Sequence, residues 1–165
     1  MPTEATCGVD ALKAELACEV LRRFGTLRFQ ATGWSMIPAI WPGETLTVRR
    51  AGRQGICLGD VVLVEREGRL CTHRVISFPE NSGIRGCITQ GDANAQPDRP
   101  VAESELLGRV IHVDRAGNQI ELTRHLTPLA RVISFFVRRS FFAARLAVYV
   151  RNRFASEESI SSCPC

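Results

Sequence analysis

Hydrophobic residues follow a helical period only near the two ends of the chain. Asp10 is a suitable helix N-cap, and apolar residues come after it at helical spacing until Gly25, a typical stop residue. Those apolar residues are Leu12, Leu16, Val20, Leu21 and Phe24. The pattern predicts an N-terminal amphipathic helix within residues 1–25.

Between residues 26 and 123 the pattern changes to short alternating or β-branched runs that are separated by Gly, Pro and Asp. Such runs are typical of β-strands. They are Thr26–Thr32, Thr45–Arg49, Val61–Glu65, Arg69–Phe78, Arg85–Thr89, Leu107–Val113 and Gln119–Leu122. Ala116-Gly117-Asn118 favours a hairpin between the last two. We therefore expect a mainly β domain over residues 26–123.

Helical spacing returns in residues 124–154, which carry seven arginines and no acidic residue. Arg131, Arg138 and Arg145 recur every seven residues, which places them within about 40° of one another on a helical wheel. This basic amphipathic helix, with Arg139 beside the stripe, could bind an anionic membrane surface or pack on the β domain. The polar, acidic tail 155–165 is expected to be disordered.

Composition adds constraints on class and location. The 165 residues suit one domain, and 45% hydrophobic with 23% charged residues is an ordinary globular composition. Acidic residues interrupt any N-terminal signal sequence, and arginines interrupt the apolar stretch 129–150, so we expect neither a signal peptide nor a membrane span. These features favour a cytoplasmic or peripheral membrane location.

The cysteines and the basic residues give no reason to expect a cofactor, a metal or a nucleic acid. Seven cysteines, an odd number spread along the chain, indicate reduced thiols rather than a disulfide framework. No C-x₂-C pair accompanies Cys71, His73 or the terminal Cys163 and Cys165, so no metal site is predicted. The basic residues of the last helix form one helical stripe, and they are not combined with aromatic residues along a β surface on which bases could stack. This pattern argues against nucleic acid binding.

A serine in the segment 33–38, Gly-Trp-Ser-Met-Ile-Pro, is the first candidate for chemistry. Ser35 lies at the end of a predicted strand, in a turn where backbone N–H groups could stabilise an oxyanion. A serine nucleophile needs a base, because its hydroxyl is almost wholly protonated at neutral pH. The available bases are Lys13, His73, His112 and His125.

His73 differs from the other bases because it projects from a predicted strand, and a rigid strand can fix the position of an imidazole. The loop 90–100 supplies two carboxylates, Asp92 and Asp98, either of which could orient that histidine. Each feature also has a structural interpretation: a partly buried strand histidine and an Asx-rich turn.

Taken in chain order, five motifs resemble the signal peptidase I superfamily. They are Ser35-Met36-x-Pro38, Gly59-Asp60-Val61-Val62, His73-Arg74-Val75-Ile76, Thr89-Gln90-Gly91-Asp92-x-Asn94 with Asp98, and Gly108-Arg109-Val110. The most similar form is the branch of the endoplasmic reticulum, archaea and some Gram-positive bacteria, in which a histidine replaces the lysine base. The resemblance covers roughly residues 30–113.

The resemblance implies a role for each matching residue. Ser35 would be the nucleophile, His73 the general base and then acid, and Asp98 the acidic residue that holds the imidazole. Asp92 would fix the loop or act as a secondary acid. The implied fold is a signal-peptidase-like β catalytic domain, and the implied activity is serine endopeptidase cleavage after small side chains of an extended polypeptide bound as an added strand.

The sequence departs from the family pattern around the nucleophile. Gly33 and Met36 are the supporting residues there, but many signal peptidases have at position 33 a small hydroxyl residue that donates to the oxyanion. Trp34 replaces a small residue, and Glu44 stands in place of an aspartate. We also expect this sequence to lack the N-terminal membrane anchor of that family.

Two alternatives remain open. The self-cleaving LexA-like repressor peptidases share the Gly-x-Ser-Met motif and cut themselves at Ala-Gly or Cys-Gly bonds, such as Cys7-Gly8, but they use lysine and carry a DNA-binding domain. The other alternative is a catalytically silent β binding module that the basic helix holds at a membrane. Each predicts a different result for a cleavage assay.

Overall fold

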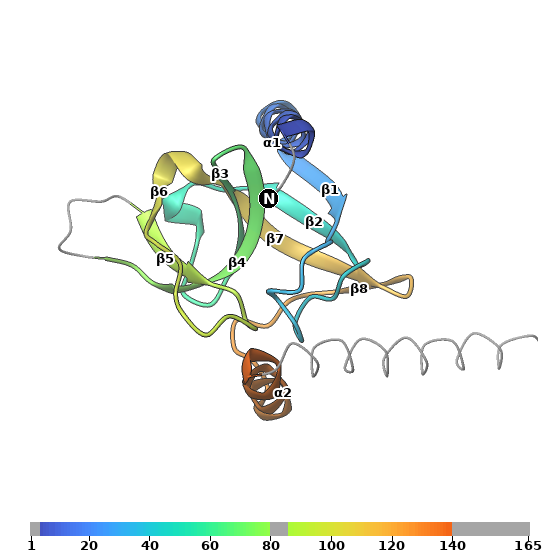
Figure 1. Ribbon diagram of the computed structural model, residues 1–165, viewed down its shortest axis with the longest axis vertical. Helices are drawn as coiled ribbons and strands as arrows, with labels where there is room; N and C mark the ends of the chain where they lie inside the picture. Colours follow the sequence, from blue (N-terminus) through green and yellow to red (C-terminus); the bar gives the residue numbers. More distant parts are fainter. Residues whose placement is uncertain (1–3, 80–85, 140–165) are drawn as a thin grey trace, which may run out of the picture.

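The computed structural model describes residues 4–79 and 86–139 (Figure 1). Its elements are α1 (Glu4–Phe24), β1 (Thr26–Gln30), β2 (Thr45–Arg50), η1 (Arg53–Gly55), β3 (Val61–Arg66), β4 (Arg69–Ser77), β5 (Gly86–Gln90), β6 (Val101–Ala102), η2 (Glu103–Glu105), β7 (Leu106–Arg115), β8 (Asn118–Ile120) and α2 (Pro128–Arg139). The prediction of a mainly β chain with an N-terminal helix is confirmed. The predicted tail and Arg145 lie outside the described residues.

All strand pairs are antiparallel, in the order β1-β2-β7-β3-β4-β5-β6, with β8 added to β7. The strands curl around a common centre (Figure 1). β1 lies at one end of this order, and four antiparallel steps separate it from β4, so the two strands run in the same direction. This matters for the site, because β1 and β4 approach each other across the open side of the sheet.

β3 is the central strand of the packing. Its four residues Val61–Val64 are all buried, and they alternate between two hydrophobic clusters. Val61 and Leu63 join the cluster beneath α1, whereas Val62 and Val64 pack in the other. Burial on both faces explains why this strand is a continuous apolar run rather than an alternating one.

α1 packs on the sheet through small side chains. Ala14, Ala17 and Leu21 are buried, whereas Leu12 and Leu16 of the predicted apolar face are 67% and 62% exposed. The turn between β3 and β4 explains why small side chains face the sheet, because α1 lies very close to this turn. A Cβ at Gly68 would lie only 3.1 Å from the Cβ of Ala11. Close approach of the helix favours alanine and leaves larger side chains at the margins, where Leu16 lines a groove.

The start of α1 and the presence of β6 were not predicted. α1 begins at Glu4 rather than near Asp10, and the two-residue strand β6 falls in a stretch with no strand pattern. β6 is defined by tertiary packing: it pairs with β5, where a Cβ at Gly86 would overlap the carbonyl of Val101. Two residues are too few to show an alternating pattern.

A buried carboxylate anchors the segment that follows β8. Asp60 accepts hydrogen bonds from the backbone N–H of Cys57 and from the side chain of Arg124, both at 2.9 Å, and Arg109 lies at 3.4 Å. Burial alone would raise the pKa of Asp60, but these donors outweigh it and hold the pKa below its ordinary value. The charged carboxylate thus fixes the chain between the sheet and α2.

Candidate active site

Ser35 lies in the loop between β1 and β2, and buried neighbours fix this loop. Met36 and Ile37, which follow it, are 4% and 0% exposed. Glu44 is also buried, and it accepts a hydrogen bond from the backbone N–H of Trp41 at 2.9 Å and one from Arg115 at 2.6 Å. Glu44 therefore stabilises the loop that presents Ser35.

His73 lies on β4 and connects two residues that are far apart in sequence. Its Nε2 is 3.0 Å from the Oγ of Ser35, and its Nδ1 is 2.6 Å from Oδ2 of Asp98. All three side chains are largely buried; those of His73 and Asp98 are 12% and 20% exposed. The three residues predicted to be catalytic thus form one hydrogen-bonded chain.

Asp98 is oriented by Thr89 of β5, a residue that the sequence analysis did not single out as part of the site. The Thr89 hydroxyl donates to Oδ2 of Asp98 at 2.7 Å, and the backbone N–H of Asp98 donates to the Thr89 carbonyl at 2.8 Å. Thr89 is 1% exposed, so it is a rigid support. In the sequence, the one feature that pointed to Thr89 was its position at the start of the motif Thr89-Gln90-Gly91-Asp92.

This arrangement determines which nitrogen of His73 carries the proton. An ionised carboxylate only accepts hydrogen bonds, so contact with Asp98 places the proton on Nδ1. Nε2 then has a free lone pair directed at the Ser35 hydroxyl. The histidine can accept the serine proton, and Asp98 stabilises the resulting imidazolium.

A second ion pair, deeper than the first, connects the site loops. Arg74 donates to both carboxylate oxygens of Asp92, at 2.8 and 2.9 Å, and to the carbonyls of Gly59 and Thr123. The side chains of Arg74 and Asp92 are 9% and 4% exposed. These hydrogen bonds connect Asp92 to Arg74 and not to Ser35, which is compatible with the loop-fixing role of Asp92.

The Asp92 loop in turn holds the Ser35 backbone. The N–H of Ala93 donates to the Ser35 carbonyl at 2.8 Å. A Cβ at Gly91 would lie 2.6 Å from that carbonyl oxygen, so only glycine permits this approach. In the described part of the chain the N–H of Ser35 itself has no acceptor, which leaves it available as an oxyanion donor.

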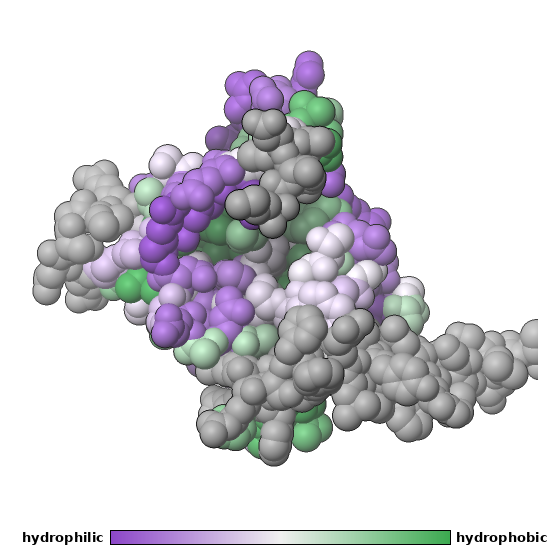
Figure 2. Space-filling model, viewed as in Figure 1, coloured by the Kyte–Doolittle hydropathy of each residue, from purple (hydrophilic) through white to green (hydrophobic). Residues whose placement is uncertain are grey.

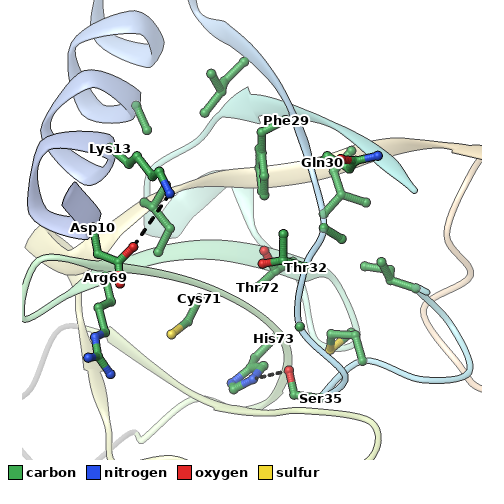
Figure 3. Close-up of a pocket in the computed structure, with 18 of the residues that line it drawn as sticks. Asp10, Lys13, Phe29, Gln30, Thr32, Ser35, Arg69, Cys71, Thr72 and His73 are labelled. Atoms are coloured by element: carbon green, nitrogen blue, oxygen red, sulfur yellow. Dashed lines mark hydrogen bonds and ion pairs between the residues drawn. The ribbon is translucent and has the colours of Figure 1, made fainter. Parts of the chain in front are cut away.

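Ser35 and His73 line a groove with a volume of about 780 Å³ between β1, β4 and α1. In the space-filling view, hydrophobic atoms line a hollow below α1 (Figure 2). Ser35 and His73 lie at one end, and Asp10 and Lys13 of α1 at the other (Figure 3). A peptide that reaches Ser35 through this groove would therefore pass α1.

The remaining base candidates do not contact Ser35. Lys13 lies in the same groove, but its ammonium pairs with Asp10 at 3.8 Å and is 68% exposed. His112 is on β7 and lines a different pocket, and His125 is exposed in the segment before α2. His73 is thus the base candidate within hydrogen-bond distance of the serine.

Gly33 and Cys71 complete the surroundings. A Cβ at Gly33 would be 4.0 Å from the Oγ of Ser35, so a side chain fits there without displacing the nucleophile. Cys71 lines the groove two residues before His73. Burial, and after it the charge of Asp98, raises the pKa of the Cys71 thiol, which keeps it protonated and a poor competing nucleophile.

Four further observations bear on the class of function. Within residues 4–79 and 86–139, no three His, Cys, Asp or Glu side chains are grouped so that they could hold a metal ion. In the same residues, no helix has the length and hydrophobicity to cross a membrane. No protein-family model matches the sequence, and no curated protein has significant sequence similarity to it.

Proposed function

We propose that this protein is a serine endopeptidase of the signal peptidase type, with Ser35 as nucleophile, His73 as general base and Asp98 as the residue that orients His73. The observation that carries the proposal is the continuous chain of hydrogen bonds from the Ser35 hydroxyl through His73 to Asp98, at 3.0 and 2.6 Å. Geometry of this kind activates a serine that is otherwise unreactive at neutral pH.

The proposed reaction proceeds through an acyl-enzyme. The Ser35 oxygen bonds to the carbonyl carbon of the scissile peptide while Nε2 of His73 takes the hydroxyl proton. The carbonyl becomes an oxyanion that the Ser35 N–H stabilises. Collapse breaks the C–N bond, and His73 returns its proton to the leaving amine. Water then hydrolyses the ester, again with His73 as base.

The strand edges around the groove support an extended polypeptide as the substrate. β1 pairs only with β2, and β4 pairs with β5 only from Arg74 onward, so residues 26–30 and 69–73 each keep one edge without a strand partner in the described part of the chain. Both edges border the groove. A peptide strand inserted there can hydrogen-bond to the backbone and place its scissile bond at Ser35.

Self-cleavage at Cys7-Gly8 is less compatible with this geometry. Both residues lie in α1. A helical peptide bond has its backbone groups paired within the helix and is not presented as an extended strand. Cleavage of another polypeptide is therefore the better supported form of the activity.

A fluorophosphonate probe and a blocked, alanine-rich peptide test the proposal on the unmodified protein. We expect one phosphonylated residue, Ser35 in the tryptic peptide map, and loss of peptide cleavage in proportion to labelling. Protein that is denatured in urea before the probe is added provides the control, and its Ser35 should not be labelled. Absence of both labelling and cleavage would contradict the proposal.

α2 favours a second property, attachment to an anionic lipid surface. Leu129 and Val132 are 71% and 52% exposed, whereas Ser134 is 3% exposed, so the helix directs apolar side chains outward. Hydrophobic atoms are visible on α2 in Figure 2. The sequence of α2 also contains Arg131 and Arg138. An exposed apolar stripe with arginines suits insertion at lipid headgroups.

Vesicle flotation tests this attachment with the full chain. We expect binding to vesicles that contain phosphatidylserine and much less to neutral vesicles. Replacing Leu129 and Val132 by serine should reduce partitioning at least about tenfold, because each apolar side chain contributes about 1.5–3 kcal/mol on burial. Equal binding of the variant and the unmodified protein would contradict the proposal that α2 attaches the protein to lipid.

A further inference from the structure

The far end of the groove, opposite Ser35, carries a small group of charges that the proposed chemistry does not use. Asp10 and Lys13 project from α1, and Arg69 from the start of β4, and all three line the groove (Figure 3). The group has two positive charges and one negative charge. Its surplus is therefore one positive charge at the end of an otherwise largely apolar channel.

Neither cation is neutralised by a strong partner. The Lys13–Asp10 pair is long, at 3.8 Å, and its side chains are 68% and 35% exposed, so water screens it. The guanidinium of Arg69 makes no hydrogen bond or ion pair with any other residue in 4–79 or 86–139. Both groups are thus available to a ligand that enters the groove.

The distance from these charges to the site follows from the strand between them. Arg69 and His73 belong to the same strand, β4, four residues apart. At about 3.3 Å per residue this is roughly 13 Å. A bound peptide strand has the same rise, so the residue beside Lys13 and Arg69 is about four or five positions from the scissile bond.

We propose that Lys13 and Arg69 form a subsite for an acidic side chain four or five residues from the scissile bond of the substrate. This inference rests on the proposed endopeptidase function. α1 is then more than a cover for the sheet, because it contributes a specificity-determining side chain to the groove. The contribution is electrostatic, and salt should weaken it.

Peptide binding to the full-length Ser35→Ala variant measures the subsite without cleavage. Two pairs of fluorescent peptides with blocked ends are used, and the two members of a pair differ only in having Glu or Gln five positions from an Ala-Ala bond. In one pair this residue precedes the bond, and in the other pair it follows the bond. At low salt, we expect the Glu peptide of the pair that reaches Lys13 and Arg69 to bind about threefold to tenfold more tightly than its Gln counterpart. Lys13→Glu or Arg69→Glu should abolish or reverse this preference.

Arg23→Glu is the matched control, because Arg23 is an exposed cation of α1 outside the groove and its reversal changes net charge equally. Lys13 is also the sole lysine of the chain. A carbodiimide should therefore cross-link the Glu peptide, and not the Gln peptide, to Lys13. Equal affinities for the two peptides, or binding of neither, would overturn the inference.

Cleavage by the unmodified protein separates this inference from the proposed function. If the unmodified protein cuts the Glu and Gln peptides at equal rates and the Ser35→Ala variant binds them equally, the subsite is wrong and the endopeptidase stands. If nothing is cut but the Ser35→Ala variant prefers Glu through Lys13 and Arg69, the endopeptidase is wrong and the acidic subsite stands.

Discussion

Alanine at Ser35 or at His73 is expected to reduce peptide cleavage by about 10⁴-fold or more, while the protein stays folded. Removing the Ser35 hydroxyl eliminates the atom that forms the acyl-enzyme. Removing His73 eliminates the group 3.0 Å from that hydroxyl that accepts its proton. Because both act in one proton transfer, the double variant should be no less active than either single variant.

His112→Ala is the matched control for this prediction. His112 is also a strand histidine, but it lies on β7 and lines a pocket remote from Ser35. Cleavage rates should be unchanged in this variant, and circular dichroism should show the same fold in all four variants as in the unmodified protein. Wild-type rates in both Ser35→Ala and His73→Ala would exclude the proposed mechanism.

The sequence alone predicts the order and type of most elements. The β-branched apolar run Val61–Glu65 and the strand pattern of Arg69–Phe78 correspond to β3 and β4, with boundaries within one residue. These strands are predictable because their side-chain pattern reflects burial within the strand itself. β6 and the packing face of α1 depend on partners distant in sequence, so a local pattern cannot reveal them.

The site is predictable in its residue types but not in its supports. A serine in a Gly/Pro turn, a strand histidine and an Asx-rich loop indicated Ser35, His73 and either Asp92 or Asp98, and only the resemblance to a family implied Asp98. The fold brings Ser35, His73 and Asp98 into contact across 38 and 25 residues. Thr89 gave no separate signal, because a buried threonine in a strand is ordinary. The role of Thr89 depends on its hydrogen bond to Asp98, which only the folded structure shows.

The charged residues of the groove show a similar limit. In the sequence Lys13 is only one of four available bases, and in the structure its side chain is exposed like that of an ordinary surface lysine. Its position beside the groove is a consequence of how α1 crosses the sheet, which the short side chains of Ala14 and Ala17 permit. A helical pattern fixes the face of a residue and not what lies opposite that face.

The two aspartates of the loop 90–100 should give opposite results when each is replaced by asparagine. Asp98→Asn removes the charge that stabilises the His73 imidazolium and can reverse its tautomer, so cleavage should fall by about 10²- to 10⁴-fold. Its free energy of unfolding should change little, because Asp98 is partly exposed and Asn keeps the side-chain size. Rates and urea unfolding curves measure both effects.

Asp92→Asn should act mainly on stability. It leaves the buried guanidinium of Arg74 without a counter-charge, which costs roughly 3–5 kcal/mol of unfolding free energy. Under conditions where this variant is still folded, cleavage should fall far less than in Asp98→Asn, because Asp92 contacts neither Ser35 nor His73 through its carboxylate in the described hydrogen bonds. An equal loss of activity in both variants, with unchanged stability, would contradict this division of roles between catalysis and the loop.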